Sequence, residues 1–344
     1  MFSRLVGNQR AQEALRRMLA NGRVPGALLF AGADGVGKKL FALELAKALN
    51  CRSPVGVEAC GHCPVCERIG KFAYPAADVR DAYEKVIWSD FGDVGLLLPR
   101  NRLIVVHAVR DLERESNFRP FEGRARVFIV EEADRLNEAA SNALLKTLEE
   151  PHPASHLILV TSRPASLLPT IRSRCQTVRF APVAAAEIEQ YLVREHRRSG
   201  EEARLAALLS RGRIAHALEL NLDKYRSERD SMLETLEALV APADRMRLLR
   251  AAEDLSDAKR KDDFEPRLEM LETLIHDVWL LAQKAPAAAL VNEDVRERLA
   301  RLGERVESRR PARWLARIAE LRAQLAVNIN RRVAADALLL SMAE

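Results

Sequence analysis

One short segment limits the possible folds of this chain more than any other. Gly32-Ala-Asp-Gly-Val-Gly-Lys38 has the spacing G-x-x-x-x-G-K, and it lies between an apolar run at 27–31 and a helical pattern at 39–49. In such a loop the backbone N–H groups surround phosphate oxygens and the lysine adds a positive charge. The motif requires this strand–loop–helix context. We therefore interpret the three glycines and the lysine as phosphate-binding residues: Gly32, Gly35, Gly37 and Lys38. The alternative is a glycine-rich turn that only packs a strand against a helix.

The residue after the loop departs from the motif. A serine or threonine is expected there, because its hydroxyl binds Mg²⁺, but this chain has Lys39. An ammonium group cannot ligate a metal ion and repels it. Nucleotide can still bind through the loop, but this substitution argues against magnesium-dependent hydrolysis.

A second strand ends in acidic residues where a nucleotide site needs them. The run at 126–130 is followed directly by Glu131 and Glu132. In nucleotide hydrolases the first acid is an aspartate that holds the metal, and the next acid positions or activates water. Glu131 is one methylene longer than that aspartate, whereas Glu132 suits the second role. The alternative is a polar strand end that caps a helix.

Apolar and helical segments alternate over the first half of the chain. Helices are predicted over 9–21, 39–49 and 137–149, and short strands over 27–31, 103–106, 126–130, 156–160 and 176–180. This alternation predicts an α/β domain whose parallel sheet is covered on both faces. Thr161 and Ser162 directly follow one strand and are further candidate nucleotide-binding residues. Residues 70–101 show no clear period and receive no assignment.

No strand is predicted after Pro182. Aromatic residues are only 5% of the chain, and the abundance of alanine, leucine, arginine and glutamate favours helices. The expected organisation is an α/β phosphate-loop domain over 1–183, a small helical domain over 184–221 and a larger all-α domain over 222–344.

Four of the five cysteines lie within 51–66, an inserted module of the first domain. Cys51, Cys60, Cys63 and Cys66 have the spacing C-x8-C-x2-C-x2-C. Four thiolates complete the tetrahedral shell of Zn²⁺ and leave no position for water, so the sequence predicts a structural zinc site. His62 is interpreted as a neighbour, because the cysteines suffice, and disulfide pairing is the alternative. Cys175 stands apart and is expected to be a small buried residue.

The charge of the chain is mildly positive. Lysine and arginine number 54 against 49 acidic residues, a net charge of +5. This excess permits contact with nucleic acid without requiring it, because most charges are expected on solvated helix faces. No stretch approaches the roughly 18 consecutive apolar residues of a membrane helix. The first ten residues lack the apolar core of a secretory signal, so we expect a cytoplasmic protein.

Further motifs extend the pattern. Ser141–Pro151 reads S-N-A-L-L-K-T-L-E-E-P, and Ser173-Arg-Cys175 follows it. Together with the phosphate loop, the cysteine module and the acidic strand, these motifs resemble the clamp-loader ATPases of the AAA+ class. The segments Leu5–Gln9 and Gly35–Lys39 look most like the delta-prime type of the bacterial DNA polymerase III clamp loader. The resemblance is good over 1–220 and looser over 222–344.

The resemblance implies a lid domain over 184–221 and a collar domain for oligomerisation over 222–344. In motor subunits the lid carries the pattern Gly-x-x-Arg-x-Ala-Leu, but Gly212–Leu218 places Ala215 at the arginine position, with Arg213 out of register. Together with Lys39 and Glu131, this makes three departures from the motor pattern. They imply a lost or weak ATPase activity, in which Glu132 is vestigial.

Arg174 of the Ser-Arg-Cys triplet is intact, and the resemblance implies that it reaches the nucleotide of a neighbouring subunit as an arginine finger in trans. A solvated or salt-bridged arginine is the alternative. The implied function is a non-motor, or stator, subunit that helps to load the sliding clamp on primed DNA. The implied partners are clamp-loader subunits of the gamma/tau and delta types. The implied cofactors are structural zinc and ATP or ADP bound without hydrolysis.

Two other functions stay open at this point. The first is a gamma/tau-like motor ATPase whose site tolerates the three departures. The second is a zinc-bearing nucleic-acid-binding module. The cysteine segment counts against the second function, since it has few interleaved basic or aromatic residues: Arg68, Lys71 and Phe72.

Overall fold

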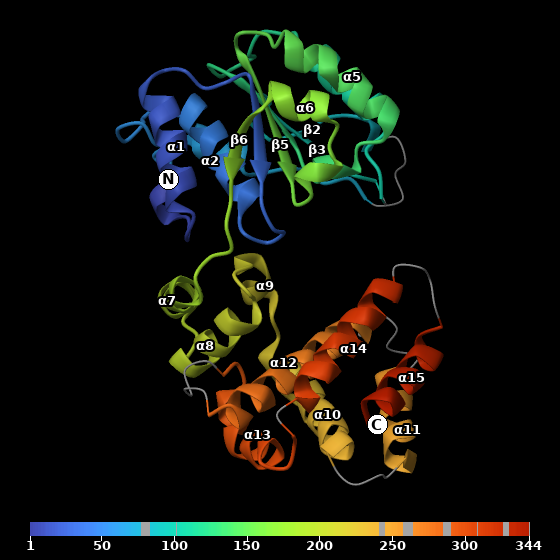
Figure 1. Cartoon of the computed structure of the whole chain (residues 1–344). Helices are drawn as coiled ribbons and strands as arrows, with labels where there is room; N and C mark the ends of the chain where they lie inside the picture. Colours follow the sequence, from blue (N-terminus) through green and yellow to red (C-terminus); the bar gives the residue numbers. More distant parts are fainter. Residues whose placement is uncertain are drawn as a thin grey trace. The chain divides into compact units, whose positions relative to one another are not determined.

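Two compact units make up the chain in the computed structural model, Met1–Glu219 and Leu220–Glu344 (Figure 1). The structure describes residues 1–76, 83–100, 102–240, 245–256, 264–284, 290–307, 309–325 and 330–343. The predicted strands and the phosphate loop belong to the first unit.

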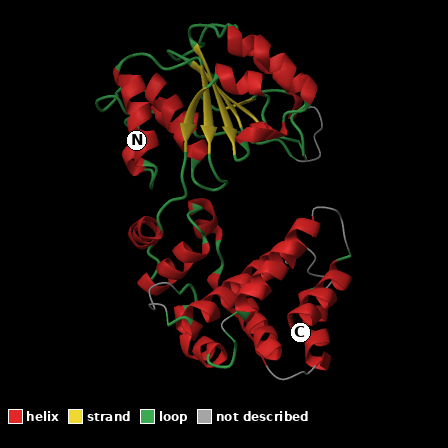
Figure 2. Ribbon diagram, in the orientation of Figure 1, coloured by secondary structure: helices red, strands yellow, loops and turns green. Residues whose placement is uncertain are grey.

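A mixed sheet forms the centre of the first unit (Figure 2). Its strands among the described residues have the order β2-β3-β4-β5-β1-β6. Only β2 and β3 run antiparallel, and every other neighbouring pair is parallel. This confirms the predicted parallel sheet and adds an antiparallel edge. The strands are β1 Ala27–Ala31, β2 Ile87–Trp88, β3 Val94–Leu97, β4 Arg126–Val130, β5 Ser155–Thr161 and β6 Gln176–Arg179.

Helices cover both faces of this sheet, which is why all residues of β1 and β4 are buried. Alternate residues of a strand point to opposite faces. Leu28 and Phe30 therefore share one core with α1 Gln9–Ala20, α2 Lys38–Asn50 and α3 Pro64–Ile69. Leu29 shares the opposite core with α4 Val106–Ser116, α5 Glu138–Glu149 and α6 Pro169–Arg174.

The predicted strand over 103–106 is wrong. Leu103 and Ile104 make only isolated bridges, and α4 begins at Val106. Ile104 N donates to Arg135 O at 2.9 Å, and Asn137 N donates to Ile104 O at 3.2 Å, but this pairing does not continue along the run as a strand. The strand beside β4 is instead β3, within the segment that received no assignment.

Three helices complete the first unit after β6. They are α7 Ala185–His196, α8 Gly200–Leu209 and α9 Ile214–Glu219. Val183 N donates to Gly212 O at 3.0 Å, which fixes the turn before α9 beside the segment that leaves the sheet.

The described residues of the second unit form helices joined by turns and loops, with no strand among them (Figure 2). Its α12 packs against α10, α13 and α14, and its α15 packs against α11. The helices are α10 Leu222–Val240, α11 Arg245–Leu255, α12 Phe264–Ala282, α13 Arg296–Gly303, α14 Arg310–Leu325 and α15 Arg331–Ala343. None of the described helices of the chain is long and apolar enough to cross a membrane.

Candidate functional site

The phosphate loop connects β1 to α2 and depends on its glycines. Gly35 and Gly37 have φ values of +77° and +95°, a region that L side chains rarely adopt. A Cβ on Gly32 would lie 2.3 Å from the carbonyl oxygen of Phe180, so no other residue fits there. The loop thus has the backbone that its sequence motif predicts.

Lys38 is turned into this loop. Its Nζ donates to Gly32 O and Ala33 O, both at 2.6 Å, and lies 3.7 Å from the carboxylate of Asp34. The side chain is only 5% exposed. Burial lowers the pKa of Lys38, and the nearby Asp34 offsets this only in part. The loop carbonyls therefore accept hydrogen bonds from the Lys38 ammonium group, which would otherwise contact a phosphate.

Two of the departures from the motor pattern meet directly. Lys39 Nζ lies 2.5 Å from Glu131 Oε1, as a charge contact that is not aligned as a hydrogen bond. Lys39 Nζ also donates to the hydroxyl of Tyr74 at 3.2 Å, and it lies 5.4 Å from the centre of that ring. Burial lowers the pKa of Lys39, but the Glu131 carboxylate and the Tyr74 hydroxyl outweigh it and raise the pKa overall. Lys39 is therefore held in its charged form.

Glu132 makes its ion pair outside the phosphate loop. It has a left-handed backbone with φ 47°, and its carboxylate pairs with Arg135 Nε at 2.7 Å. Its side chain is 46% exposed. The ion pair of the Glu132 carboxylate is thus with Arg135, whereas Lys38 contacts Asp34 and the loop carbonyls.

Thr161 at the end of β5 is buried and fully engaged. Its hydroxyl donates to Asp134 Oδ1 at 2.6 Å and accepts from Arg163 N at 3.0 Å. The side chain of Arg163 closes this group through two further bonds to Asp134 Oδ2. Burial raises the pKa of Asp134, but the donors Thr161 and Arg163 outweigh it and keep the pKa below its usual range. Ser162, the next candidate, is half-buried.

Sequence reasoning missed Asp134, Arg163 and Tyr74. Asp134 is the last acid of the run Glu131-Glu132-Ala133-Asp134, and that run was the available signal for it. Arg163 follows the candidate pair at the end of β5. Tyr74 lies in the segment without periodicity, where the sequence offers no signal.

Helix α9 begins directly beside the phosphate loop. Ala215 N donates to Gly35 O at 3.0 Å, and a Cβ on Gly35 would lie 3.1 Å from the Cβ of Arg213. The position where a motor subunit has arginine thus supplies a backbone N–H group to the loop. All three departures, Lys39, Glu131 and Ala215, make internal contacts.

Arg174 lies at the C-terminal end of α6. Its guanidinium donates to Thr170 O at 3.0 Å and pairs with Glu149 Oε1 at 2.6 Å. The Arg174 and Glu149 side chains are 35% and 49% exposed, so the pair is open to solvent. Glu149 ends α5 and belongs to the Ser141–Pro151 motif. Cys175 beside it is buried as expected, and burial raises the pKa of its thiol to about 11.

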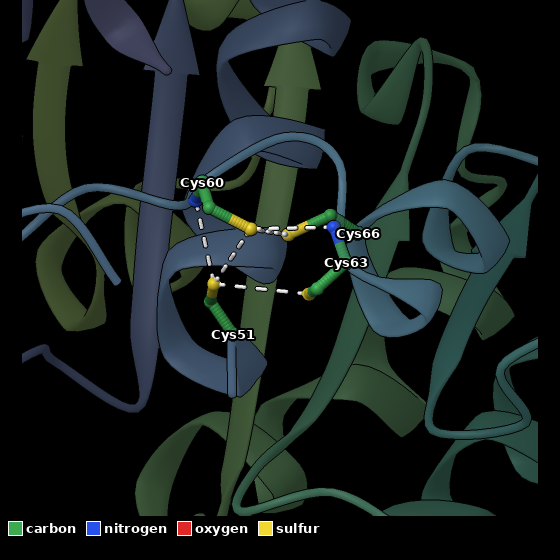
Figure 3. A group of neighbouring side chains, drawn as sticks. All are labelled: Cys51, Cys60, Cys63 and Cys66. Carbon is green, nitrogen blue, oxygen red and sulfur yellow. Dashed lines mark hydrogen bonds between the residues drawn. The ribbon is translucent and has the colours of Figure 1, made fainter. Parts of the chain in front are cut away.

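The four predicted cysteines converge between α2 and α3 (Figure 3). Their sulfurs all lie within 4.8 Å of one another, with Cys51–Cys60, Cys51–Cys63 and Cys60–Cys66 at 3.6, 3.9 and 4.0 Å. A tetrahedral ion with bonds of about 2.3 Å would place its sulfurs about 3.8 Å apart. All five cysteines are free thiols, so the disulfide alternative is wrong. The cluster can bind a metal ion.

Backbone N–H groups point at these sulfurs. Cys60 N donates to Cys51 Sγ and Cys63 N donates to Cys60 Sγ, both at 3.3 Å (Figure 3). Burial raises the pKa of Cys63, but the backbone N–H groups of Cys66 and Arg52 outweigh it, and the pKa falls to about 6. These donors stabilise negative sulfur, the form that binds metal. His62 is exposed, its Nδ1 lies 3.1 Å from Cys60 O, and it is outside the cluster.

Comparisons with known proteins match most of this chain to subunits of DNA polymerase III. The family model described as DNA polymerase III, delta subunit, matches residues 7–184, and that of its C-terminal region matches residues 224–344. The chain is 32% identical to DNA polymerase III subunit delta' of Escherichia coli, over 93% of this chain and 89% of that protein. It is 30% identical to DNA polymerase III subunit tau of Salmonella typhimurium, over 83% of this chain and 45% of that protein.

One solved structure is similar over most of its length. It is a DNA polymerase III gamma subunit-related protein from Thermotoga maritima, with a TM-score of 0.45 and 20% identity. The match covers 96% of this chain and 97% of that one.

Proposed function

The chain belongs to the DNA polymerase III delta-subunit family, and we propose that it is the non-motor subunit of a bacterial clamp loader. It helps to load a sliding clamp on primed DNA, and it supplies Arg174 to the nucleotide site of a neighbouring ATPase subunit. Its partners are the other clamp-loader subunits, of the gamma/tau and delta types. The clamp and the primed DNA are reached through the complex.

The observation that carries this proposal is a contrast within the first unit. The charged side chains of this chain's own nucleotide site contact other protein groups. Lys38 donates to loop carbonyls, and Lys39 is paired with Glu131. The lid contributes Ala215 N, bonded to Gly35 O, where a motor subunit has a guanidinium. Arg174 stays on the surface. A subunit that completes its neighbour's site without hydrolysing nucleotide itself needs this combination.

The chemistry proposed for Arg174 is stabilisation of charge on a transferring phosphoryl group. An arginine finger contributes roughly 10³–10⁵ in rate to the site that it completes. The guanidinium is oriented by Glu149 Oε1 at 2.6 Å and by Thr170 O at 3.0 Å. Because this pair is open to solvent, it contributes little to stability. Arg174 is thus free to exchange its partner for a phosphate.

The remaining assignments complete the proposal. Cys51, Cys60, Cys63 and Cys66 bind one structural zinc ion, and the loop residues 32–38 hold ATP or ADP without hydrolysis. Residues 184–221 act as the lid and residues 222–344 as the collar through which the subunit joins the complex. The sulfur geometry supports the zinc site, and the hydrogen bond from Ala215 N to Gly35 O supports the lid role of residues 184–221.

The test is steady-state ATP hydrolysis with primed DNA and clamp, measured for the pure chain and then with the other loader subunits. We expect no turnover by the chain alone and DNA-stimulated turnover after mixing. Arg174→Ala should lower the stimulated rate by at least the contribution of one site, because that site loses a finger worth roughly 10³–10⁵. Arg172→Ala is the matched control, since Arg172 is exposed on the same helix, two residues away.

Two results would contradict the proposal. An unchanged rate in Arg174→Ala, with normal assembly, would remove the finger assignment. Turnover by the chain alone that disappears in Lys38→Ala would identify a motor ATPase instead.

A further inference from the structure

We propose that Lys39 and Glu131 together occupy the magnesium position of the phosphate-loop site, so that this chain binds nucleotide without a divalent metal. This inference rests on the proposed function, because it concerns the same nucleotide site. It goes further by naming the ligand class, a nucleotide polyphosphate free of Mg²⁺, and the two residues that select it.

Lys39 and Glu131 occupy the two sequence positions whose side chains bind Mg²⁺ in phosphate-loop proteins. In phosphate-loop proteins the hydroxyl after the loop lysine and an acid at the end of a second strand hold Mg²⁺ between them. Here the first position carries a fixed cation, and its Nζ lies 2.5 Å from the carboxylate at the second position. The ion pair thus joins α2 to β4, the connection that the metal makes in a hydrolysing site.

The residue lengths support the replacement. A hydroxyl and an aspartate leave room for an ion between them, whereas Lys39 and Glu131 are both longer and meet directly. The exposed fractions are 33% for Lys39 and 20% for Glu131, and the hydroxyl of Tyr74 accepts from Lys39 Nζ at 3.2 Å. The carboxylate is thus already neutralised by a group that repels a second cation.

The groups that remain for phosphate are those of the loop itself. Backbone N–H groups of the loop and the buried Lys38 can meet phosphate oxygens once Lys38 leaves the carbonyls of Gly32 and Ala33. None of these groups needs a metal ion. With Lys39 and Glu131 at the metal positions, the charge of a bound phosphate is therefore balanced by the loop and Lys38 and not by Mg²⁺. The loop backbone itself keeps its ordinary form.

The experiment measures binding of a fluorescent ATP analogue to the full-length chain with and without Mg²⁺. The metal-free buffer is prepared with a chelating resin, so that zinc is not stripped by a soluble chelator. For the wild-type chain we expect affinities equal within about twofold in the two buffers. For Lys39→Thr/Glu131→Asp, which restores both metal positions, we expect Mg²⁺ to raise affinity by at least about tenfold.

Lys39→Met/Glu131→Gln is the matched control. It removes both charges at nearly constant length and creates no metal site, so its binding should be indifferent to Mg²⁺. Zinc content and melting temperature report whether each variant is folded. If the Thr/Asp variant does not fold, the wild-type comparison decides, and tenfold tighter wild-type binding with Mg²⁺ overturns the proposal.

The remaining outcomes of the binding experiment also test the proposal. If the folded wild-type chain binds the analogue in neither buffer, the proposal is overturned. If the folded Thr/Asp variant binds the analogue equally well with and without Mg²⁺, the assignment of Lys39 and Glu131 to the magnesium position is overturned. Arg174 is unchanged in every variant. DNA-stimulated hydrolysis by the reconstituted complex therefore tests the stator role separately, and either proposal can fail alone.

Discussion

At the scale of single residues, the cysteine cluster is held in a tightly defined geometry. Four buried sulfurs lie within 4.8 Å of one another, and backbone N–H groups favour their negative form. Four thiolates at such distances repel one another unless a cation lies between them. The loss of one ligand should therefore matter more than the loss of an ordinary buried side chain.

We expect Cys63→Ser to lose most of its zinc and to melt at a lower temperature, because a serine hydroxyl is not deprotonated at neutral pH and is a poor zinc ligand. Cys175→Ser is the control, since Cys175 is equally buried at 8% but lies outside the cluster. It should keep about one zinc ion per chain. Metal analysis by mass spectrometry together with thermal melting checks both variants. Full zinc content and unchanged melting in Cys63→Ser would contradict the ligand set.

The sequence was sufficient to predict these cysteines and the place of Lys38, because both belong to motifs with fixed local spacing. It was not sufficient for Lys39 and Glu131, which appear in the sequence as two separate departures from a pattern. Their contact depends on α2 and β4 lying side by side, which only the fold supplies. The same holds for Thr161 and Asp134, which meet across the ends of neighbouring strands.

At the scale of elements, the sequence did not predict strand β3, because its composition departs from that of an ordinary strand. β3 contains Gly95, and a Cβ there would lie 2.3 Å from Val86 Cγ1 and 3.3 Å from Phe128 and Trp88. The glycine is needed for this packing, yet glycine is unfavourable in strands and hides the apolar period. The error at 103–106 is the reverse. Its residues have the composition of a strand, but they lead into helix α4.

The turn before α9 gives a prediction at this scale. Gly212 has φ +82°, and a Cβ there would lie 2.5 Å from Pro182 Cβ and 2.9 Å from Val183 N. Gly212→Ala combines a left-handed backbone with a steric clash, and should lower the free energy of unfolding by about 3 kcal/mol. Gly22→Ala is the control, because Gly22 has φ +61° with nothing within 4 Å of the added Cβ. That variant should lose only about 1–2 kcal/mol.

Denaturant unfolding of the two glycine variants measures this difference. Equal losses would show that the turn before α9 can move away from Pro182. A larger loss for Gly212→Ala would show that this turn is held firmly beside the phosphate loop, where Ala215 N donates to Gly35 O.

At the scale of the whole molecule, the chain divides into two compact units, and the second contains a buried polar network. In the second unit the buried carboxylate of Asp277 accepts hydrogen bonds from Val291 N, Asn292 N and Asn292 Nδ2 at 2.9–3.0 Å. Asn292 in turn accepts from the hydroxyl of Tyr225 at 2.8 Å. This network joins α10 and α12 to the segment that precedes α13. The four-cysteine cluster lies entirely in the first unit.

We therefore expect Asp277→Ala to destabilise the helical unit by about 3–5 kcal/mol, because it leaves three donors, two of them buried, without their acceptor. Asp223→Ala is the control, since the Asp223 side chain on α10 is 98% exposed. If residues 222–344 form the collar, Asp277→Ala should enter the reconstituted complex poorly while it keeps about one zinc ion per chain. Size-exclusion chromatography with the partner subunits and metal analysis measure the two properties on the same sample. Loss of zinc together with assembly would show that the units are coupled, and normal assembly of a chain with an unfolded helical unit would exclude the collar role.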